Sequence, residues 1–155
     1  MSTSEFPVHD SFRSARVARL ATSGADGVPH LVPIVFALAD DTLFTCVDHK
    51  PKRTRALRRL ANIAANPRVS ILVDHYTDDW TALWWVRVDG AAQVVDASTT
   101  LGTRGVDALA AKYPQYREHR PAGAVIAVHD LTWHSWTASG ATPCLLYTSP
   151  SPRDR

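Results

Sequence analysis

A cluster of basic residues is the part of this sequence best suited to chemistry. Six of the 17 Lys and Arg residues fall within ten positions: Lys50, Lys52, Arg53, Arg55, Arg58 and Arg59. Such a cluster produces a local positive field that suits phosphate or carboxylate groups. The alternative reading is the solvated face of a helix. No nucleic-acid partner is expected, because the net charge is only +2 and no aromatic residue is interleaved among positions 50–59.

The other reactive side chains form no recognised catalytic or metal-binding pattern. His30, His75, His129 and His134 could exchange protons near neutral pH, but the sequence identifies no acidic partner for any of them. Their spacing does not match that of metal ligands, so no metal site is predicted. Cys46 lies in an apolar run and is interpreted as a small buried residue, not a nucleophile. The absence of a G-x-S-x-G motif disfavours hydrolysis.

The basic cluster lies at the head of a predicted helix. Between positions 52 and 65 apolar residues recur at helical spacing, and Asn66-Pro67 is a stop signal. A second helix is predicted over residues 99–113. Strands are predicted over residues 16–22, 31–39, 43–47, 69–74, 83–95 and 124–128.

Pro33 and Gly90 indicate where the predicted strands should have an edge or a bulge. Pro33 cannot donate to a strand ladder, so it should lie at an edge or a bulge. Gly90 should mark a bulge or a close approach of two backbones. Alternation along residues 83–95 assigns Trp84, Val86 and Val88 to one face and Trp85, Arg87 and Asp89 to the other. The pattern predicts an α+β, mainly β fold: a six-stranded antiparallel barrel with short helices.

Length and composition predict one cytoplasmic domain. The chain has 155 residues, of which 45% are hydrophobic, and no apolar run approaches the roughly 18 residues of a membrane span. No apolar secretory segment is found near the N-terminus. Residues 1–140 are expected to form the domain. Residues 141–155, rich in Pro, Ser and Thr, are expected to be an unpacked tail, whose composition suggests a cloning or assembly scar.

Three segments, in their order and spacing, resemble the pyridoxamine 5′-phosphate oxidase-like split-barrel superfamily: RVARLAT…DGVPHLVPIVF, LFTCVDHKPKRTRALRRLANIAANPRVSILVD and DDWTALWWVRVDGAAQVV. Within it they look most like the branch of actinobacterial deazaflavin (coenzyme F420)-dependent oxidoreductases. The resemblance covers residues 12–137, most of the chain.

The resemblance implies a six-stranded FMN-binding split barrel and a homodimer with two cofactor sites at the subunit interface. It assigns the cofactor's phosphate to basic residues after the third strand, where a helix N-terminus would add free N–H groups. Backbone groups at 33–35 and 45–47 would hold the ring and ribityl chain. Trp85 would pack on the ring across the dimer, or else pack within the barrel. The cofactor-site residues are Val32, Pro33, Ile34, Thr45, Cys46, Lys50, Lys52, Arg53, Arg55 and Trp85.

Two uncharged positions lead the resemblance to favour F420 over FMN as the cofactor. Flavin-using oxidases of the superfamily carry an Arg and a Lys along the second strand, and these positions fall near Val32 and Ala37 here. Their loss disfavours FMN binding of the oxidase type, whereas the anionic oligoglutamate tail of F420 suits the additional Arg residues. The expected activity is hydride transfer from reduced F420 to an electron-poor small molecule. The alternatives are an FMN-dependent oxidoreductase and a non-catalytic flavin- or haem-binding protein. No catalytic residue is assigned.

Overall fold

The computed structural model describes the backbone of residues 6–47 and 53–138 and the side chains of residues 10–47 and 58–138. Lys50, Lys52 and the predicted tail at 141–155 lie outside the described residues, as do the side chains of Arg53 and Arg55. The elements are α1 (Phe6–Ser14), β1 (Ala18–Ser23), β2 (Pro29–Ile34), β3 (Ala37–Ala39), β4 (Thr42–Cys46), α2 (Arg53–Ala65), β5 (Arg68–His75), η2 (Trp80–Ala82), β6 (Trp84–Asp96), α3 (Thr100–Lys112), α4 (Pro114–Glu118) and β7 (Ala124–Thr137).

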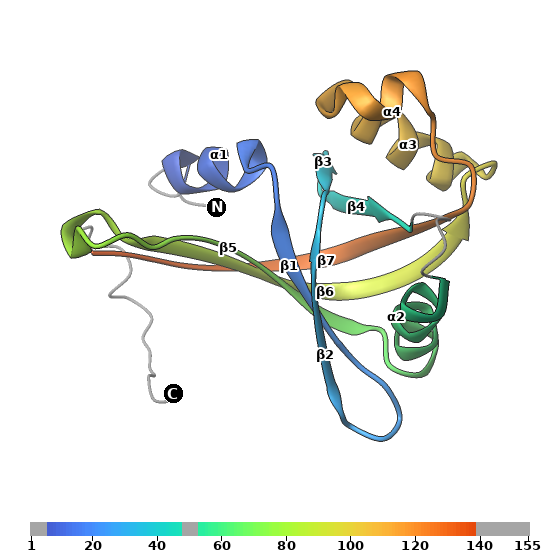
Figure 1. Ribbon diagram of the computed structural model, residues 1–155, viewed down its shortest axis with the longest axis horizontal. Helices are drawn as coiled ribbons and strands as arrows, with labels where there is room; N and C mark the ends of the chain where they lie inside the picture. Colours follow the sequence, from blue (N-terminus) through green and yellow to red (C-terminus); the bar gives the residue numbers. More distant parts are fainter. Residues whose placement is uncertain (1–5, 48–52, 139–155) are drawn as a thin grey trace.

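The described strands form one antiparallel sheet in the order β2-β1-β5-β6-β7-β4-β3. Its two outermost strands, β2 and β3, are separated in the chain by Val35 and Phe36 alone. The sheet therefore curls until its two edges meet at this corner. Figure 1 shows β1 and β2 running across the long strands β5, β6 and β7. The result is the mainly β, antiparallel split barrel with short helices that the sequence predicts.

The predicted strand over residues 31–39 is wrong in one respect: the structure divides it into β2 and β3. The sheet consequently has seven strands, where six were predicted. The break falls at Val35 and Phe36, where the chain turns from one edge of the sheet to the other. The prediction for Pro33 is confirmed, because it lies in the edge strand β2, which pairs only with β1 among the described strands.

Strands β6 and β7 confirm the prediction for Gly90 and correct the predicted end of the last strand. Opposite Gly90, β7 carries two residues, Asp130 and Leu131, which makes a bulge between the flanking pairs. A Cβ on Gly90 would lie 2.8 Å from the His129 carbonyl oxygen, so the backbones approach closely. Asp130 has a φ of 58°. Because the bulge absorbs the extra residue, β7 continues past position 128 to Thr137.

The two predicted helices are confirmed as α2 and α3, whereas α1 and α4 were not predicted. Thr99 caps α3 by accepting a hydrogen bond from Gly102 N at 3.0 Å. Pro114 ends that helix and begins α4, a position that proline favours. None of the described helices is long and apolar enough to cross a membrane.

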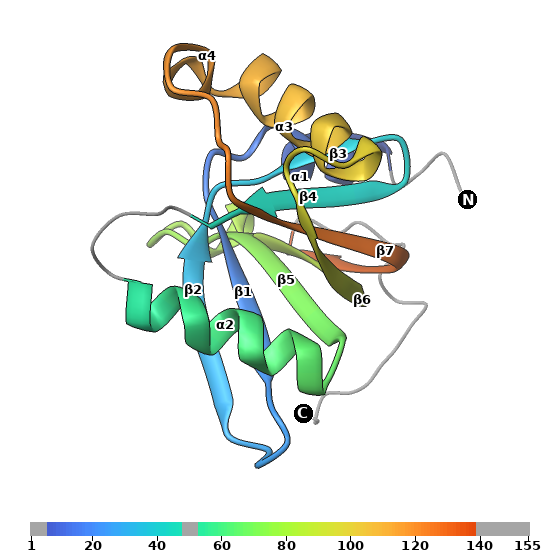
Figure 2. The same ribbon diagram turned by 90° about the vertical axis from the view of Figure 1, so that its right-hand side faces the viewer.

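Two apolar clusters hold these elements together. The first fills the barrel, where Phe12 of α1 contacts Phe36 and Trp133 with ring centroids 5.1 Å apart in each pair. The second joins the sheet to α3, which packs on β4 through Gly105 and Phe44. In Figure 2, α3 and α4 lie above β3 and β4, and α2 lies across the other end of the barrel.

Candidate functional site

The corner between β2 and β3 brings together the predicted residues of the second and third strands. The Thr45 hydroxyl, 1% exposed, donates to the Val35 carbonyl oxygen at 2.7 Å. The Phe36 N–H donates to the Tyr113 hydroxyl at 3.2 Å, and Lys112 Nζ donates to the Phe36 carbonyl oxygen at 2.9 Å. Side chains from β4 and from the end of α3 thus satisfy backbone groups that no strand ladder reaches here.

The side chains of the predicted residues at this corner point in different directions. Ile34 and Cys46 are buried in the two apolar clusters, and Val32 packs against the barrel core. Pro33 is exposed on the outer face of the sheet. Since three of these side chains face the core, the part of this segment that can meet a ligand is the backbone and the exposed ring of Pro33, and the buried Thr45 hydroxyl acts on that backbone by donating to Val35.

Helix α2 connects the basic cluster to the first two strands. Arg53 and Arg55 lie in its first turn, where backbone N–H groups have no partner within the helix. Further along, Asn62 Nδ2 donates to Thr22 Oγ1 at 3.0 Å, and both side chains are buried. This hydrogen bond fixes α2 against β1. The helix therefore holds its basic residues beside the β1–β2 hairpin.

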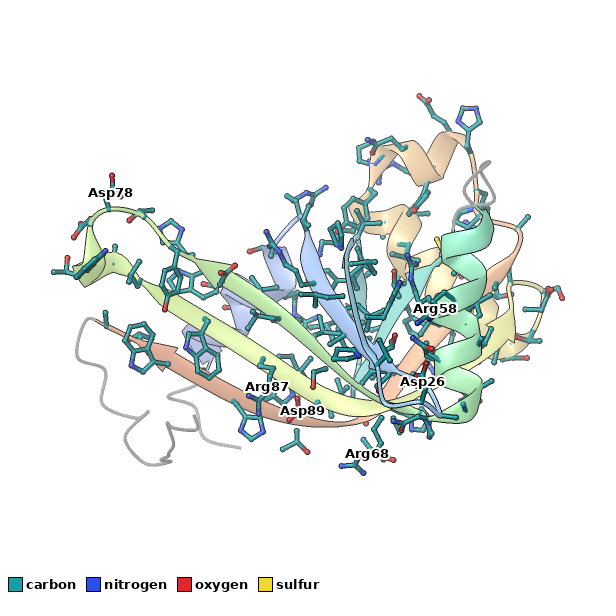
Figure 3. All side chains as sticks on the ribbon, turned by 60° about the horizontal axis from the view of Figure 1, so that its bottom comes forward. Asp26, Arg58, Arg68, Asp78, Arg87 and Asp89 are labelled. Carbon is teal, nitrogen blue, oxygen red and sulfur yellow. The ribbon has the colours of Figure 1, made fainter. Side chains whose placement is uncertain are left out.

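The pKa of His30 on β2 is affected by the positive charges of α2. Burial, followed by the charges of Arg58 and Arg59, lowers the pKa of its imidazole. Its Nδ1 atom is buried and receives no hydrogen bond from the described residues. Figure 3 shows Arg58 projecting from α2 near the β1–β2 hairpin, whose turn carries Asp26. The sequence did not indicate that the charges of α2 reach His30, because Arg58 lies 28 positions further along the chain.

Trp85 lies on the face opposite Val86 and Val88, as the alternation predicts, and this is the outer face of the sheet. It is half-buried, and its register partners are Asp74 on β5 and Trp136 on β7. Pro33 shares this outer face, but strands β1 and β5 lie between β2 and β6. Three strand spacings amount to about 14 Å. The structure therefore does not bring Trp85 together with the β2–β4 residues within one chain.

A polar network occupies the same outer face beside Trp85. Asp89 accepts two hydrogen bonds from Arg87, at 2.9 and 3.1 Å, and one from the Ser70 hydroxyl at 2.7 Å. His134 Nε2 lies 3.3 Å from the second carboxylate oxygen. Burial acts to raise the pKa of Asp89, but these hydrogen bonds and the charges of Arg87 and His134 outweigh it and lower the pKa. Figure 3 shows Arg87 and Asp89 side by side on β6.

A pocket of about 330 Å³ opens next to this network. It lies where β1, β5 and β6 run side by side, and Asp89 and Arg68 are its charged residues. Its lining residues are Ala21, Thr22, Ser23, Pro29, Arg68, Val69, Ser70, Asp89 and Gly90. Among the described residues, no group of three or more His, Cys, Asp or Glu side chains could hold a metal ion.

Exposed aromatic residues at the tip of the β5–β6 arm were missed in the sequence analysis. Tyr76 is 61% exposed and Trp80 is 75% exposed, beside the stacked pair of His75 and Trp84. Figure 1 shows this arm extending far from the rest of the barrel. The signal in the sequence was two aromatic residues within the polar loop between two strands. Such large exposed rings are typical of surfaces that contact another molecule.

The family follows from comparison with known proteins. The family profile described as pyridoxamine 5'-phosphate oxidase matches residues 7–137. The chain belongs to this family. The match covers every strand of the sheet and all the predicted cofactor-site residues. No curated protein matches the chain.

Solved structures share the split barrel with this member of the pyridoxamine 5'-phosphate oxidase family. The conserved hypothetical protein Rv2991 from Mycobacterium tuberculosis is 24% identical over 98% of this chain and 92% of its own, with a TM-score of 0.64. HutZ, the heme storage protein from Vibrio cholerae, is 18% identical over 84% of this chain and 92% of its own, with a TM-score of 0.64. An FAD-binding protein from Mesorhizobium loti is 20% identical over 87% and 92%, with a TM-score of 0.54.

Proposed function

We propose that this protein is a cytoplasmic, homodimeric F420-dependent oxidoreductase that acts on an electron-poor small molecule. The observation that carries the proposal is the position of Arg58 and Arg59 near His30 on β2, where burial and then the charges of these two residues lower the pKa of the imidazole. The cofactor's negative groups would neutralise this positive field. When bound in its reduced form, F420 supplies the hydride for the reaction.

Two segments would bind the cofactor: the basic residues of α2 and the backbone at the β2–β3 corner. Lys52, Arg53 and Arg55 would hold the phosphate at the start of α2, where free N–H groups add to the binding. Arg58 and Arg59 would meet the carboxylates of the oligoglutamate tail. The backbone at the β2–β3 corner, fixed by the Thr45 hydroxyl, would orient the ring and the ribityl chain.

Two apolar positions favour F420 over FMN. Val32 packs against the barrel core, and Ala37 is 3% exposed within the second cluster. Side chains at these two positions face apolar surroundings, so they offer no cation to an FMN phosphate. FMN and haem stay as alternatives, since HutZ is a heme storage protein and the protein from Mesorhizobium loti binds the flavin FAD.

A second copy of the chain would complete the site. Trp85 is separated from the β2–β4 residues within one chain, so its predicted contact with the ring requires a partner subunit. Trp136 beside it and the exposed Tyr76 and Trp80 on the arm supply further aromatic surface for such an interface. Light scattering after size-exclusion chromatography would give the mass of a dimer.

Titration of the purified protein with F420, FMN and haem, followed by fluorescence and absorbance, tests the proposal. Micromolar F420 binding with much weaker FMN binding is expected. Tight binding of FMN or haem in its place would overturn the choice of cofactor. An independent readout is the pKa of His30 measured by NMR, which should rise when F420 neutralises Arg58 and Arg59. An unchanged pKa of His30 would show that the oligoglutamate tail does not bind at this part of α2.

A further inference from the structure

The outer face of β2, β1, β5 and the first half of β6 is a continuous exposed surface. Its outward side chains are partly or fully exposed, whereas their neighbours along each strand fill the barrel core. Leu31 on β2 is 67% exposed, although it is large and apolar. The outward residues are Pro29, Leu31, Pro33, Arg19, Ala21, Ser70, Leu72, Asp74, Trp85, Arg87 and Asp89. An exposed face with several apolar side chains is typical of a contact with another molecule.

The charged side chains on this face are paired within the chain. Arg19 lies 3.8 Å from Asp74, and Arg87 donates two hydrogen bonds to Asp89. The face can therefore be covered without leaving these charges unpaired. Since a two-fold axis brings a surface against its own copy, this balance also avoids repulsion between like charges. Arg68, at the margin of the face, forms no ion pair with the described residues and would lie in the polar rim of an interface.

The outer face carries a projection and a hollow at the same level of the sheet. The projection is the exposed side chain of Leu31 on the edge strand β2. The hollow is the pocket of about 330 Å³, which Ala21, Ser70 and Asp89 help to line. Register pairs align these four residues in one row, from Leu31 through Ala21 and Ser70 to Asp89. A second copy of the same face can thus place its projection in the hollow.

We propose that this outer face binds a second copy of the chain, through a two-fold axis that runs along the strands between β1 and β5. The inference rests on the proposed homodimer and specifies which surfaces meet in it. In the strand order β2-β1-β5-β6, this axis exchanges β1 with β5 and β2 with β6. Leu31 of the partner subunit then faces Asp89 and the pocket.

The same axis brings Trp85 to the β2–β3 corner of the partner subunit. A second row of register pairs consists of Pro33, Arg19, Leu72 and Arg87. The axis therefore places Arg87 opposite Pro33 of the partner subunit. In the next row, Trp85 is two positions before Arg87 and Val35 is two positions after Pro33, so Trp85 reaches the level of Val35 at the corner. The interface thus supplies the ring contact that strand spacing prevents within one chain.

Leu31→Glu tests the interface without reference to the cofactor. The variant places a carboxylate opposite Asp89 of the partner subunit, so it should weaken dimerisation at least about tenfold. Val94→Glu is the matched control, because Val94 is 39% exposed on β6 but alternates with Trp85 and Asp89 and so belongs to the other face. Light scattering after size-exclusion chromatography, over a dilution series, gives the dissociation constants, and circular dichroism confirms that each variant is folded.

The outcomes of this comparison separate the interface from the homodimer. A monomeric wild type would contradict the homodimer, and the inference with it. A wild-type dimer that Leu31→Glu leaves intact, or that both variants weaken equally, would overturn the assigned face alone.

Co-expression of two defective chains tests the position of Trp85. One chain carries Trp85→Ala, and the other carries Lys52→Ala with Arg53→Ala, so each alone lacks one part of the proposed F420 site. In a mixed dimer, one of the two sites combines the intact residues of both chains. With random assembly, about a quarter of all sites should regain wild-type affinity for F420.

Mixed dimers in which no site regains wild-type affinity would show that Trp85 does not act across the interface. Failure of the wild type to bind F420 would contradict the proposed function alone, and the light-scattering comparison would still decide the interface.

Discussion

The hydroxyl of Tyr113 engages both backbone groups of Phe36: it accepts from the N–H at 3.2 Å and lies 3.1 Å from the carbonyl oxygen. Phe36 lies between β2 and β3, where neither strand ladder satisfies these groups. A side chain 77 positions further along the chain replaces the ladder. Closure of the barrel therefore couples the β2–β3 corner to the end of α3.

Tyr113→Phe should destabilise the protein by about 1–3 kcal/mol, because it leaves the buried N–H of Phe36 without a partner while it keeps the ring. Urea denaturation measures the change in the free energy of unfolding. Tyr76→Phe is the matched control, since Tyr76 is 61% exposed and should show little change. If both variants unfold at the same urea concentration, the Tyr113 hydroxyl does not stabilise the corner.

The sequence predicted the elements whose patterns are local. The two-residue period of β6 correctly placed Val86 and Arg87 on opposite faces, and the structure shows that Val86 faces the core. The corner could not be predicted, because residues 31–39 read as one apolar run with no turn residue apart from Pro33. The break depends on Tyr113 and Lys112, which are remote in sequence. Neither α1 nor the five-residue α4 has a pattern strong enough to predict it.

The candidate site was predictable in part for the same reason. The basic residues at the head of a helix are a local pattern, and α2 does begin at Arg53. The electrostatic effect of α2 on His30 is a tertiary relationship, and the buried pair of Asn62 and Thr22 holds the helix against β1. The roles of Lys50, Lys52, Arg53 and Arg55 in phosphate binding remain predictions.

Asp89→Asn should destabilise the protein at neutral pH by about 1 kcal/mol, a modest value because the side chain is one-third exposed. The folded-state pKa of Asp89 is lowered. Its carboxylate therefore stabilises the fold above the unfolded pKa of about 3.9, and this contribution is lost as the pH falls through the lower folded value. The difference between wild type and variant should shrink from pH 7 towards strongly acidic pH.

The exposed pair of Arg19 and Asp74 provides the control for Asp89. Arg19 Nη1 and Asp74 Oδ1 are 3.8 Å apart in this exposed pair, so Asp74→Asn should change stability little at any pH. Thermal unfolding of the three proteins across the pH range gives the comparison. If the difference in melting temperature between wild type and Asp89→Asn stays constant with pH, the ionised carboxylate is not the stabilising group.

Gly105→Ala should lower the melting temperature, although alanine favours a helix over glycine by about 1 kcal/mol. A Cβ at this position would lie 2.5 Å from Cδ1 of the buried Phe44 ring, so α3 would be forced away from β4. Overpacking of this kind costs about 1–3 kcal/mol, enough to reverse the helix preference. Gly123→Ala is the control, because nothing lies within 4 Å of its Cβ. A more stable Gly105→Ala variant would mean that Phe44 moves aside freely.

The double variant Lys52→Ala with Arg53→Ala should weaken F420 binding at least about tenfold, which corresponds to roughly 1.4 kcal/mol. The two cations at the start of α2 add charge-assisted hydrogen bonds to the N–H groups of the first turn, so their loss weakens binding of the phosphate. Fluorescence titration gives the dissociation constants. Arg104→Ala with Arg120→Ala removes the same charge from residues paired with Asp40 and Asp107, and it should bind F420 normally. Unchanged affinity in the Lys52 and Arg53 variant, with an intact circular dichroism spectrum, would rule out the phosphate assignment and leave the His30 side of α2 as the remaining anion-binding surface.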